Sequence, residues 1–177
     1  MLFAFYLAAE IVSCLILIFV IYVLLRPLVS GAVYFPTSPE NLAIILKMAE
    51  VRPGDKIADL GSGDGRILIA LAKAGAEAHG YEVNPLLVRR SRRAIFKAGL
   101  EERAAVHWTS FWRANLSRYD AVVVYGFPHI MKKLGEKLKR ELTPGTKVIS
   151  NIYVFPNWAE AKSENKVHLY IVPATRK

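Results

Sequence analysis

A glycine-rich turn between two apolar segments constrains the fold of this chain more than any other feature. The stretch Lys56-Ile-Ala-Asp-Leu-Gly-Ser-Gly-Asp-Gly-Arg-Ile67 begins with a short aliphatic run and leads into a segment of helical period that continues to Lys73. This order predicts a buried parallel strand, a loop and a helix. Glycines in the loop let its backbone approach a ligand closely. Open α/β sheets bind their ligands at such a point, where a strand ends and a helix begins.

Acidic residues around this loop indicate which ligand it suits. Asp59 stands two residues before the first glycine, Asp64 lies within the loop, and Glu82 ends the next apolar run. The glycine spacing also departs from the G-x-G-x-x-G of dinucleotide-binding loops. Carboxylates here would repel a diphosphate, but they would attract the ammonium and sulfonium groups of S-adenosylmethionine, while Glu82 could accept hydrogen bonds from ribose hydroxyls. The sequence therefore predicts S-adenosylmethionine as cofactor, with a purely structural turn as the alternative.

The first 25 residues carry a single charged side chain, that of Glu10. A bilayer core requires about 20 mostly apolar residues, so we expect one transmembrane helix over residues 1–28. Every Lys and Arg of the chain follows this run, beginning with Arg26, which favours a single-pass membrane protein with its C-terminal domain in the cytoplasm. A cleaved signal peptide is one alternative, although no basic residue precedes the apolar run. A buried or oligomer-forming hydrophobic helix is the other.

Strand and helix signals alternate through the rest of the chain, which is typical of βαβ units and a parallel sheet. After a linker over residues 29–38, the pattern predicts helices over residues 39–49, 66–73, 85–98 and 128–141 and strands over 57–60, 78–82, 104–110, 120–126 and 146–152. Segments 158–162 and 166–172 flank a polar Ser-Glu-Asn turn and predict an antiparallel hairpin. The expected fold class is α/β: a Rossmann-like, doubly wound, mostly parallel sheet with a C-terminal antiparallel hairpin, preceded by one N-terminal transmembrane helix.

Six short motifs together carry a resemblance to a known family. They are Tyr34-Phe-Pro-Thr37, Asp59-Leu-Gly-Ser-Gly-Asp-Gly-Arg-Ile67, Gly80-Tyr-Glu-Val-Asn-Pro85, Ser110-Phe-Trp112, Tyr125-Gly-Phe-Pro128 and Phe155-Pro-Asn-Trp158. With these motifs the chain resembles class I, seven-β-strand S-adenosylmethionine-dependent methyltransferases. Among them it is most similar to the mitochondrial protein-lysine methyltransferases of the ADP/ATP translocase and the ATP synthase c-subunit, and it looks like a prokaryotic relative. The resemblance implies a methyltransferase domain over residues 39–177.

The resemblance also implies which residues hold the cofactor. In the family, the loop that matches the segment from Asp59 to Gly65 surrounds the methionine and ribose parts, and the acid that matches Glu82 takes the ribose hydroxyls. An acid or amide usually follows the third strand to meet the adenine, where this chain has Ser110 instead. The expected cofactor-binding residues are Asp59, Gly61, Ser62, Gly63, Asp64, Gly65, Glu82, Asn84 and Ser110.

The methyl acceptor is expected beyond the fourth strand. Many amine and amide methyltransferases have an Asx-Pro-Pro-Tyr loop there, and its absence here argues against nucleobase or glutamine methylation. Aromatic side chains can line the stem of a lysine and attract its ammonium form by roughly 0.5–2 kcal/mol. The expected catalytic and acceptor-wall residues are Tyr34, Thr37, Tyr125, Phe127, Pro128 and Trp158, and ordinary core aromatics are the alternative. The histidines lack metal-ligand spacing, so no metal is predicted.

Basic residues gather on two of the expected helices. They are Arg89, Arg90, Arg92, Arg93 and Lys97 on one, and Lys132, Lys133, Lys137, Lys139 and Arg140 on the other. Such a surface fits nucleic acid or an anionic leaflet, where each basic residue contributes about 1 kcal/mol, and the apolar N-terminal run favours the membrane. We therefore expect a membrane-anchored protein-lysine N-methyltransferase acting on membrane-associated proteins. The alternatives are a methyltransferase of a small amine or lipid headgroup and a non-catalytic membrane adaptor.

Overall fold

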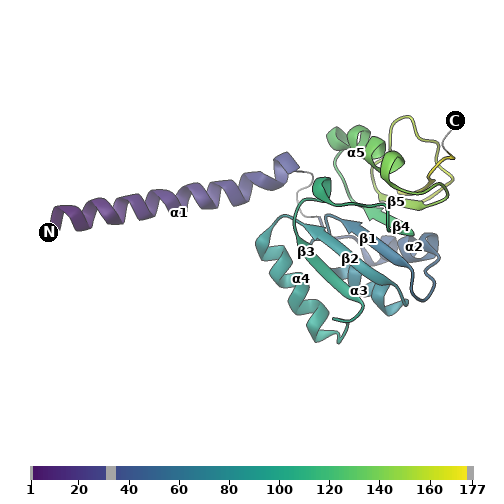
Figure 1. Cartoon of the computed structure of the whole chain (residues 1–177), viewed down its shortest axis with the longest axis horizontal. Helices are drawn as coiled ribbons and strands as arrows, with labels where there is room; N and C mark the ends of the chain where they lie inside the picture. Colours follow the sequence, from purple (N-terminus) through teal and green to yellow (C-terminus); the bar gives the residue numbers. More distant parts are fainter. Residues whose placement is uncertain (1, 31–34, 175–177) are drawn as a thin grey trace.

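One seven-stranded sheet organises the domain, and its strand order is β3-β2-β1-β4-β5-β7-β6. The computed structural model describes residues 2–30 and 35–174, with side chains for residues 6–23 and 35–174 (Figure 1). The strands are β1 Lys56–Leu60, β2 Glu77–Glu82, β3 Ala104–Trp108, β4 Ala121–Val124, β5 Lys147–Asn151, β6 Lys162–Glu164 and β7 Val167–Ile171. The helices are α1 Leu2–Ser30, α2 Pro39–Ala49, α3 Arg66–Lys73, α4 Pro85–Lys97 and α5 Pro128–Glu141, with a short 3₁₀ turn, η1, at Phe111–Arg113.

The first five strands run parallel, and β7 pairs antiparallel with both β5 and β6. The strand order reverses at β1, since β2 lies on one side of it and β4 on the other. In doubly wound sheets the crevice outside the carboxyl ends of the strands at this reversal is the usual ligand site. The expected α/β fold, with its mostly parallel sheet and antiparallel C-terminal hairpin, is confirmed.

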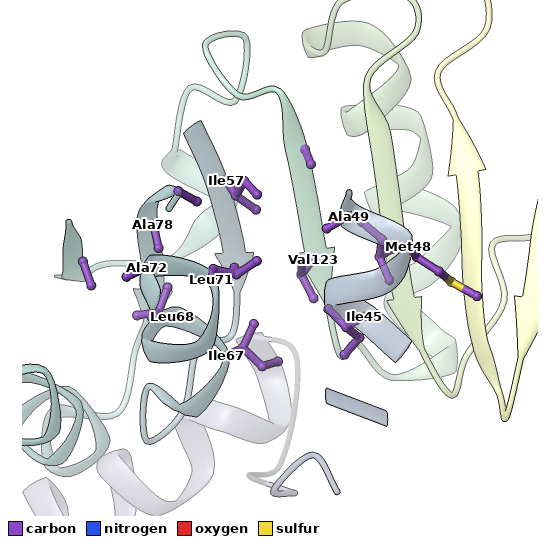
Figure 2. Close-up of a cluster of buried hydrophobic side chains, with 14 of the residues drawn as sticks. Ile45, Met48, Ala49, Ile57, Ile67, Leu68, Leu71, Ala72, Ala78 and Val123 are labelled. Carbon is purple, nitrogen blue, oxygen red and sulfur yellow. The ribbon is translucent and has the colours of Figure 1, made fainter. Parts of the chain in front are cut away.

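Apolar side chains are buried on both faces of the sheet. Figure 2 shows one face, where Leu68 and Leu71 of α3 and Ile45 of α2 pack over Ile57 and Val123. On the other face the buried side chains of α5 and of the C-terminal strands cover the remaining strand residues. A central strand between two covered faces needs no polar alternation, which explains the uninterrupted apolar sequence of β4. Each fully buried aliphatic side chain contributes about 1.5–3 kcal/mol.

Two helices start as their sequences predict. Ser38 is the N-cap of α2, where its hydroxyl accepts a hydrogen bond from the Asn41 N–H at 3.2 Å, and proline is the first helical residue. Asn84 caps α4 in the same way, accepting from the Leu86 N–H at 2.9 Å. Side-chain caps of this kind satisfy backbone donors that a helix leaves open. The cap of α4 also fixes the chain immediately after β2.

Helix α1 points away from the domain and approaches it at its C-terminal end (Figure 1). It continues two residues past the expected boundary at residue 28 and ends at Ser30. Its segment Tyr6–Val23 has a mean hydropathy of 2.4, and none of that segment is buried against the protein. By length and composition it is the one helix, among the residues with described structure, that could cross a membrane.

The C-terminal hairpin turns two residues later than expected. Ser163 and Glu164, predicted to form the turn, belong to β6 and pair with β7. The turn is made by Asn165 and Lys166, both at positive φ, 46° and 61°. Two-residue hairpin loops favour positive φ at both central positions because that twist matches the twist of the strands. The segment containing Trp158 is consequently a loop and not the first strand of the hairpin.

This turn gives a stability prediction. Glycine adopts positive φ without the steric cost that a lysine incurs, and Lys166 is exposed. Lys166→Gly should therefore raise the free energy of unfolding by about 0.5–1 kcal/mol, measured by urea denaturation. Lys162→Gly, in β6, is the control and should lower it, because glycine weakens a strand. A loss of stability in Lys166→Gly would contradict the assignment of strain to this turn.

Candidate functional site

A cleft that is partly open to solvent lies at the carboxyl ends of β1, β2 and β4. Its lining combines the loop after β1, the turn after β2, the start of the segment after β4, and residues 35–37 ahead of α2. Of the residues expected to bind the cofactor, Asp59, Gly61, Ser62, Gly63, Asp64, Glu82 and Asn84 line it. Segments that lie apart in the sequence are thus brought to the place where the sheet order reverses.

The glycine loop approaches α4 closely at Gly65. Gly61, Gly63 and Gly65 all have positive φ, at 89°, 54° and 84°. A Cβ atom on Gly65 would collide with the Ser91 hydroxyl of α4. Gly65 therefore packs against α4 and is not among the residues that line the cleft. On Gly80 a Cβ atom would come within 2.5 Å of the Ser62 hydroxyl. Glycine is required at Gly65 and Gly80 because no side chain has room there.

Glu82 ties the loop to the end of β2. Its carboxylate is buried and accepts hydrogen bonds from the backbone N–H groups of Gly63 at 3.0 Å and of Val83 and Asn84 at 2.8 Å each. A carboxylate offers about four acceptor positions, so one remains after these three bonds. Glu82 therefore shapes the cofactor loop as well as offering an acceptor for a ribose hydroxyl.

Asp59 is a buried carboxyl with an unsatisfied oxygen. Its side chain is 2% exposed, and its Oδ2 has no hydrogen-bond partner in the described part of the chain. Burial raises the pKa of the Asp59 carboxyl to about 8, and the charges of Glu82 and Asp64 contribute to that rise. A cation placed in the cleft would stabilise the ionised form. This orphaned oxygen fits the ammonium group of S-adenosylmethionine, and the glycine backbone at Gly61 and Gly63, which lines the cleft, fits a ligand that approaches backbone atoms.

Asp64 forms an ion pair with Arg66, which the sequence pattern does not indicate. The guanidinium contacts the Asp64 carboxylate through Nη2–Oδ2 at 2.9 Å and Nε–Oδ1 at 3.1 Å. Asp64 therefore contributes less negative potential than the sequence suggests, and Asp59 and Glu82 carry the preference for a cation.

The same guanidinium holds the segment ahead of α2. Arg66 Nη1 donates to the Thr37 carbonyl at 2.9 Å, and the Thr37 hydroxyl accepts from Asn151 Nδ2 at 3.3 Å. Asn151 in turn accepts from Asn41 at 2.8 Å. Thr37 is buried and lines the cleft as expected, whereas no local pattern indicates the arginine and asparagine that hold it there.

Three aromatic rings gather after β4 and β5. The ring centroid of Tyr153 lies 6.4 Å from that of Tyr125 and 6.1 Å from that of Phe127. Tyr125 lines the cleft, and burial together with the neighbouring Tyr153 raises the pKa of its phenol, so the phenol stays protonated at neutral pH. Tyr153 was not among the residues predicted from the sequence. Ile152 before it has φ of 74°, a rare conformation for a β-branched residue, which turns the chain as it leaves β5.

Other expected site residues lie apart from the cleft lining. Trp158 packs against Phe155 and Tyr170, and its Nε1 donates to the Ile171 carbonyl at 3.1 Å. Pro128 is the first residue of α5 and is exposed. Ser110 caps η1 by accepting from the Trp112 N–H at 3.4 Å. Tyr34 lies outside the described residues.

The basic surface differs from expectation at Lys137. This ammonium is buried, lies 2.7 Å from the Glu141 carboxylate and donates to the Ala114 carbonyl at 2.9 Å. Lys137 therefore stabilises the attachment of α5 and adds nothing to the positive face. On α4, Arg89, Arg90, Arg93 and Lys97 are exposed or nearly so, as expected. Within residues 6–23 and 35–174, no three His, Cys, Asp or Glu side chains form a group that could hold a metal ion.

Comparison with known proteins adds to this geometry. The model of the ANTKMT methyltransferase domain matches residues 59–162. A lysine N-methyltransferase of the ATP synthase c-subunit from Xenopus laevis is 38% identical over 144 residues, which cover 78% of this chain and 63% of the relative. The chain thus spans about three fifths of that relative's length. A protein-lysine N-methyltransferase of Saccharolobus islandicus (strain REY15A) is 30% identical, over 78% of this chain and 92% of the relative.

A solved structure shares the fold over most of its length. It is an RNA methyltransferase from Salinibacter ruber in complex with S-adenosyl-L-homocysteine, with a TM-score of 0.77 and 30% identity. The alignment covers 81% of this chain and 97% of the other.

The raised pKa of Asp59 predicts proton release when the cofactor binds. In the free protein the carboxyl is protonated below about pH 8, and a bound ammonium would lower its pKa, so at pH 6.5–7 binding should release up to about one proton. Calorimetry in buffers of different ionisation enthalpy measures this number. Asp59→Asn should abolish the release, and Asp55→Asn, at a turn before β1, should leave it unchanged. Equal heats in all buffers for the unaltered protein would refute the assignment.

The Arg66 contacts predict that replacing this arginine weakens cofactor binding and also loosens the segment ahead of α2. Arg66→Gln removes one charged partner of Asp64 and the donor to the Thr37 carbonyl, so we expect weaker cofactor binding, by about tenfold, and faster hydrogen exchange at residues 35–41. The matched control is Arg89→Gln, an exposed arginine on α4. If cofactor affinity fell while hydrogen exchange at 35–41 stayed unchanged, Arg66 would act on the loop alone.

Proposed function

The chain belongs to the family of the ANTKMT methyltransferase domain, a group of class I S-adenosylmethionine-dependent methyltransferases, and we propose that it methylates lysine side chains of membrane-associated proteins. The observation that carries this proposal is the aromatic group of Tyr125, Phe127 and Tyr153, of which Tyr125 lines the cleft while Phe127 and Tyr153 lie behind the lining. Relatives named as lysine N-methyltransferases support the choice of acceptor. An alkyl stem can pack along such rings, and their faces attract an ammonium group.

The cofactor-binding residues of the proposal are those that line the cleft. Asp59 would meet the ammonium group, Glu82 a ribose hydroxyl, and the backbone around Gly61 and Gly63 the body of the ligand. Val83 and Phe111 add apolar walls next to Glu82, and they are candidates for contact with the adenine in place of Ser110. When bound, S-adenosylmethionine supplies an electrophilic methyl group on a sulfonium.

The protein's part in the reaction is to position and desolvate the acceptor. Attack by an amine needs a neutral nitrogen and an approach in line with the bond that breaks, more than it needs a strong acid or base. Burial between Tyr125, Tyr153 and Thr37 would favour the neutral form of a lysine. The protonated phenol of Tyr125 cannot act as a base at neutral pH, which is consistent with a positioning role.

Helix α1 supplies the proposed anchor. We propose that its apolar segment Tyr6–Val23 spans a membrane once and that the domain faces the cytoplasm, since all Lys and Arg residues follow this segment. Relatives named as lysine N-methyltransferases of the ATP synthase c-subunit support a protein acceptor. A domain anchored in this way would reach lysines at the bilayer surface.

A second candidate is methylation of RNA. It is favoured by the similarity to the Salinibacter ruber RNA methyltransferase and by the exposed basic residues of α4. Against it, the segment after β4 has the sequence Tyr125-Gly-Phe-Pro128, which contains no side-chain amide or carboxylate to hold the amino group of a nucleobase. Small amines and lipid headgroups are further acceptors of suitable chemistry, and the same assay separates all of them.

The test is transfer of a labelled methyl group from S-adenosylmethionine into a membrane fraction supplied with the full chain. We expect label in protein, at lysine side chains identified by mass spectrometry. Tyr153→Ala should lower kcat/KM for the protein acceptor at least tenfold with little change in cofactor affinity, because Tyr153 lies against Tyr125 and outside the cofactor end of the cleft.

Phe96→Ala, at an exposed aromatic on α4, is the matched control and should leave both quantities unchanged. Label in RNA or in lipid, with none in protein, would replace the proposed acceptor by one of the others. Failure of the purified chain to bind S-adenosylmethionine would remove the enzymatic proposal altogether.

A further inference from the structure

Three large apolar side chains are exposed in the cleft lining or directly next to it, and we name them the cleft rim. Phe35, Leu86 and Trp108 are 57%, 70% and 60% exposed. Phe35 lines the cleft itself, and Leu86 stands between the lining residues Asn84 and Leu87. The Trp108 indole donates to the carbonyl of Val83, another lining residue, at 3.2 Å. Exposed apolar groups that cluster at a site indicate a contact surface.

The cleft rim is held close to the end of helix α1. The chain from Ser30, where α1 ends, to Phe35 is five residues long and can span at most about 18 Å. A small hollow also joins the two, lined by Phe19, Tyr22 and Val23 of α1 and by Val83, Pro85 and Trp108 of the domain. Those α1 residues belong to the apolar segment Tyr6–Val23. The rim therefore lies at the depth of the last turns of the proposed span.

A basic stripe continues from the rim along α4. Arg89, Arg90, Arg93 and Lys97 follow Leu86 at intervals of 3, 4, 7 and 11 residues, which places all of them on one face of the helix. All four are exposed. Tryptophan and leucine at the headgroup level with arginine and lysine beside them are typical of surfaces that bind an anionic bilayer.

We propose that the cleft rim and this basic stripe form a second membrane contact, which places the opening of the cleft at the surface of an anionic leaflet. Leu86 and Trp108 enter the interfacial layer, and the arginines meet lipid phosphates. The inference rests on the proposed anchor and narrows the substrate class to lysines at the headgroup level of membrane proteins. A bilayer is favoured over nucleic acid because burying Leu86 gains free energy in lipid, whereas a phosphate backbone offers it no apolar partner.

The first test measures depth in the bilayer. The full chain with Cys14→Ser receives single cysteines, Leu86→Cys or Trp108→Cys, and a spin label, and is placed in nanodiscs with and without phosphatidylglycerol. We expect the labels at 86 and 108 to be accessible to lipid-dissolved oxygen and protected from a water-soluble relaxing agent when the anionic lipid is present. A label from Lys73→Cys is the control. Lys73 is exposed at the C-terminal end of α3, at the edge of the sheet opposite the cleft, so its label should stay aqueous.

The second test separates orientation from chemistry. Leu86→Asp should lower methyl transfer to a lysine of a membrane-embedded protein at least tenfold and leave transfer to a soluble lysine peptide unchanged. Aspartate in the first turn suits a helix, so the variant should fold. Lys73→Glu, at the far end of α3, is the control and should change neither activity. If the labels at 86 and 108 stayed accessible to the water-soluble agent while the unaltered chain still transferred methyl groups, this inference would be wrong. The proposed function would not be affected by that result.

Two other outcomes have distinct meanings. Protection of the label at 86 by single-stranded RNA without any protection by lipid would overturn the inference in favour of a nucleic-acid surface. If the unaltered chain transferred methyl groups to neither the peptide nor the membrane protein, that result would instead contradict the proposed function, whatever the labels report.

Discussion

Three hydrogen bonds to the Glu82 carboxylate hold together the parts of this molecule that its proposed chemistry needs. They come from the backbone of the glycine loop and of the turn after β2. Hydrogen bonds to a buried carboxylate contribute more than neutral ones, and leaving such a charge without them would be costly. Glu82 thereby fixes the loop before α3 and the turn before α4 relative to each other, and it leaves Asp59 as the buried carboxyl in the cleft that no described side chain or backbone group fully satisfies.

Local patterns in the sequence were enough to predict the fold and most of the residues that meet where the sheet order reverses. The glycines at positive φ, the caps at Ser38 and Asn84 and the apolar strands are set by residues within a few positions of one another. Their order along the chain then restricts the sheet topology, because parallel strands need crossover helices. The resemblance to class I methyltransferases drawn from these motifs is confirmed by the family match.

The acceptor side depends on contacts between distant segments, which the sequence does not reveal. Tyr153 reaches Tyr125 because Ile152 takes a positive φ as the chain leaves β5. Trp158, in a motif of similar appearance, packs against Tyr170 instead. Lys137 looks like any other lysine of a basic helix until Glu141 and the Ala114 carbonyl are found beside it. Pattern identifies an aromatic or a basic residue, but only tertiary packing decides which face it presents.

Arg66 connects the cofactor loop with the chain that comes from the apolar helix. Because one guanidinium binds both Asp64 and the Thr37 carbonyl, a displacement of residues 35–37 is transmitted to the loop that would hold the cofactor. The buried amides of Asn41 and Asn151 hold the same segment from the opposite side. Thr37 is only seven residues from the end of α1, so residues 35–37 are the part of the cleft lining that lies closest in the sequence to that helix.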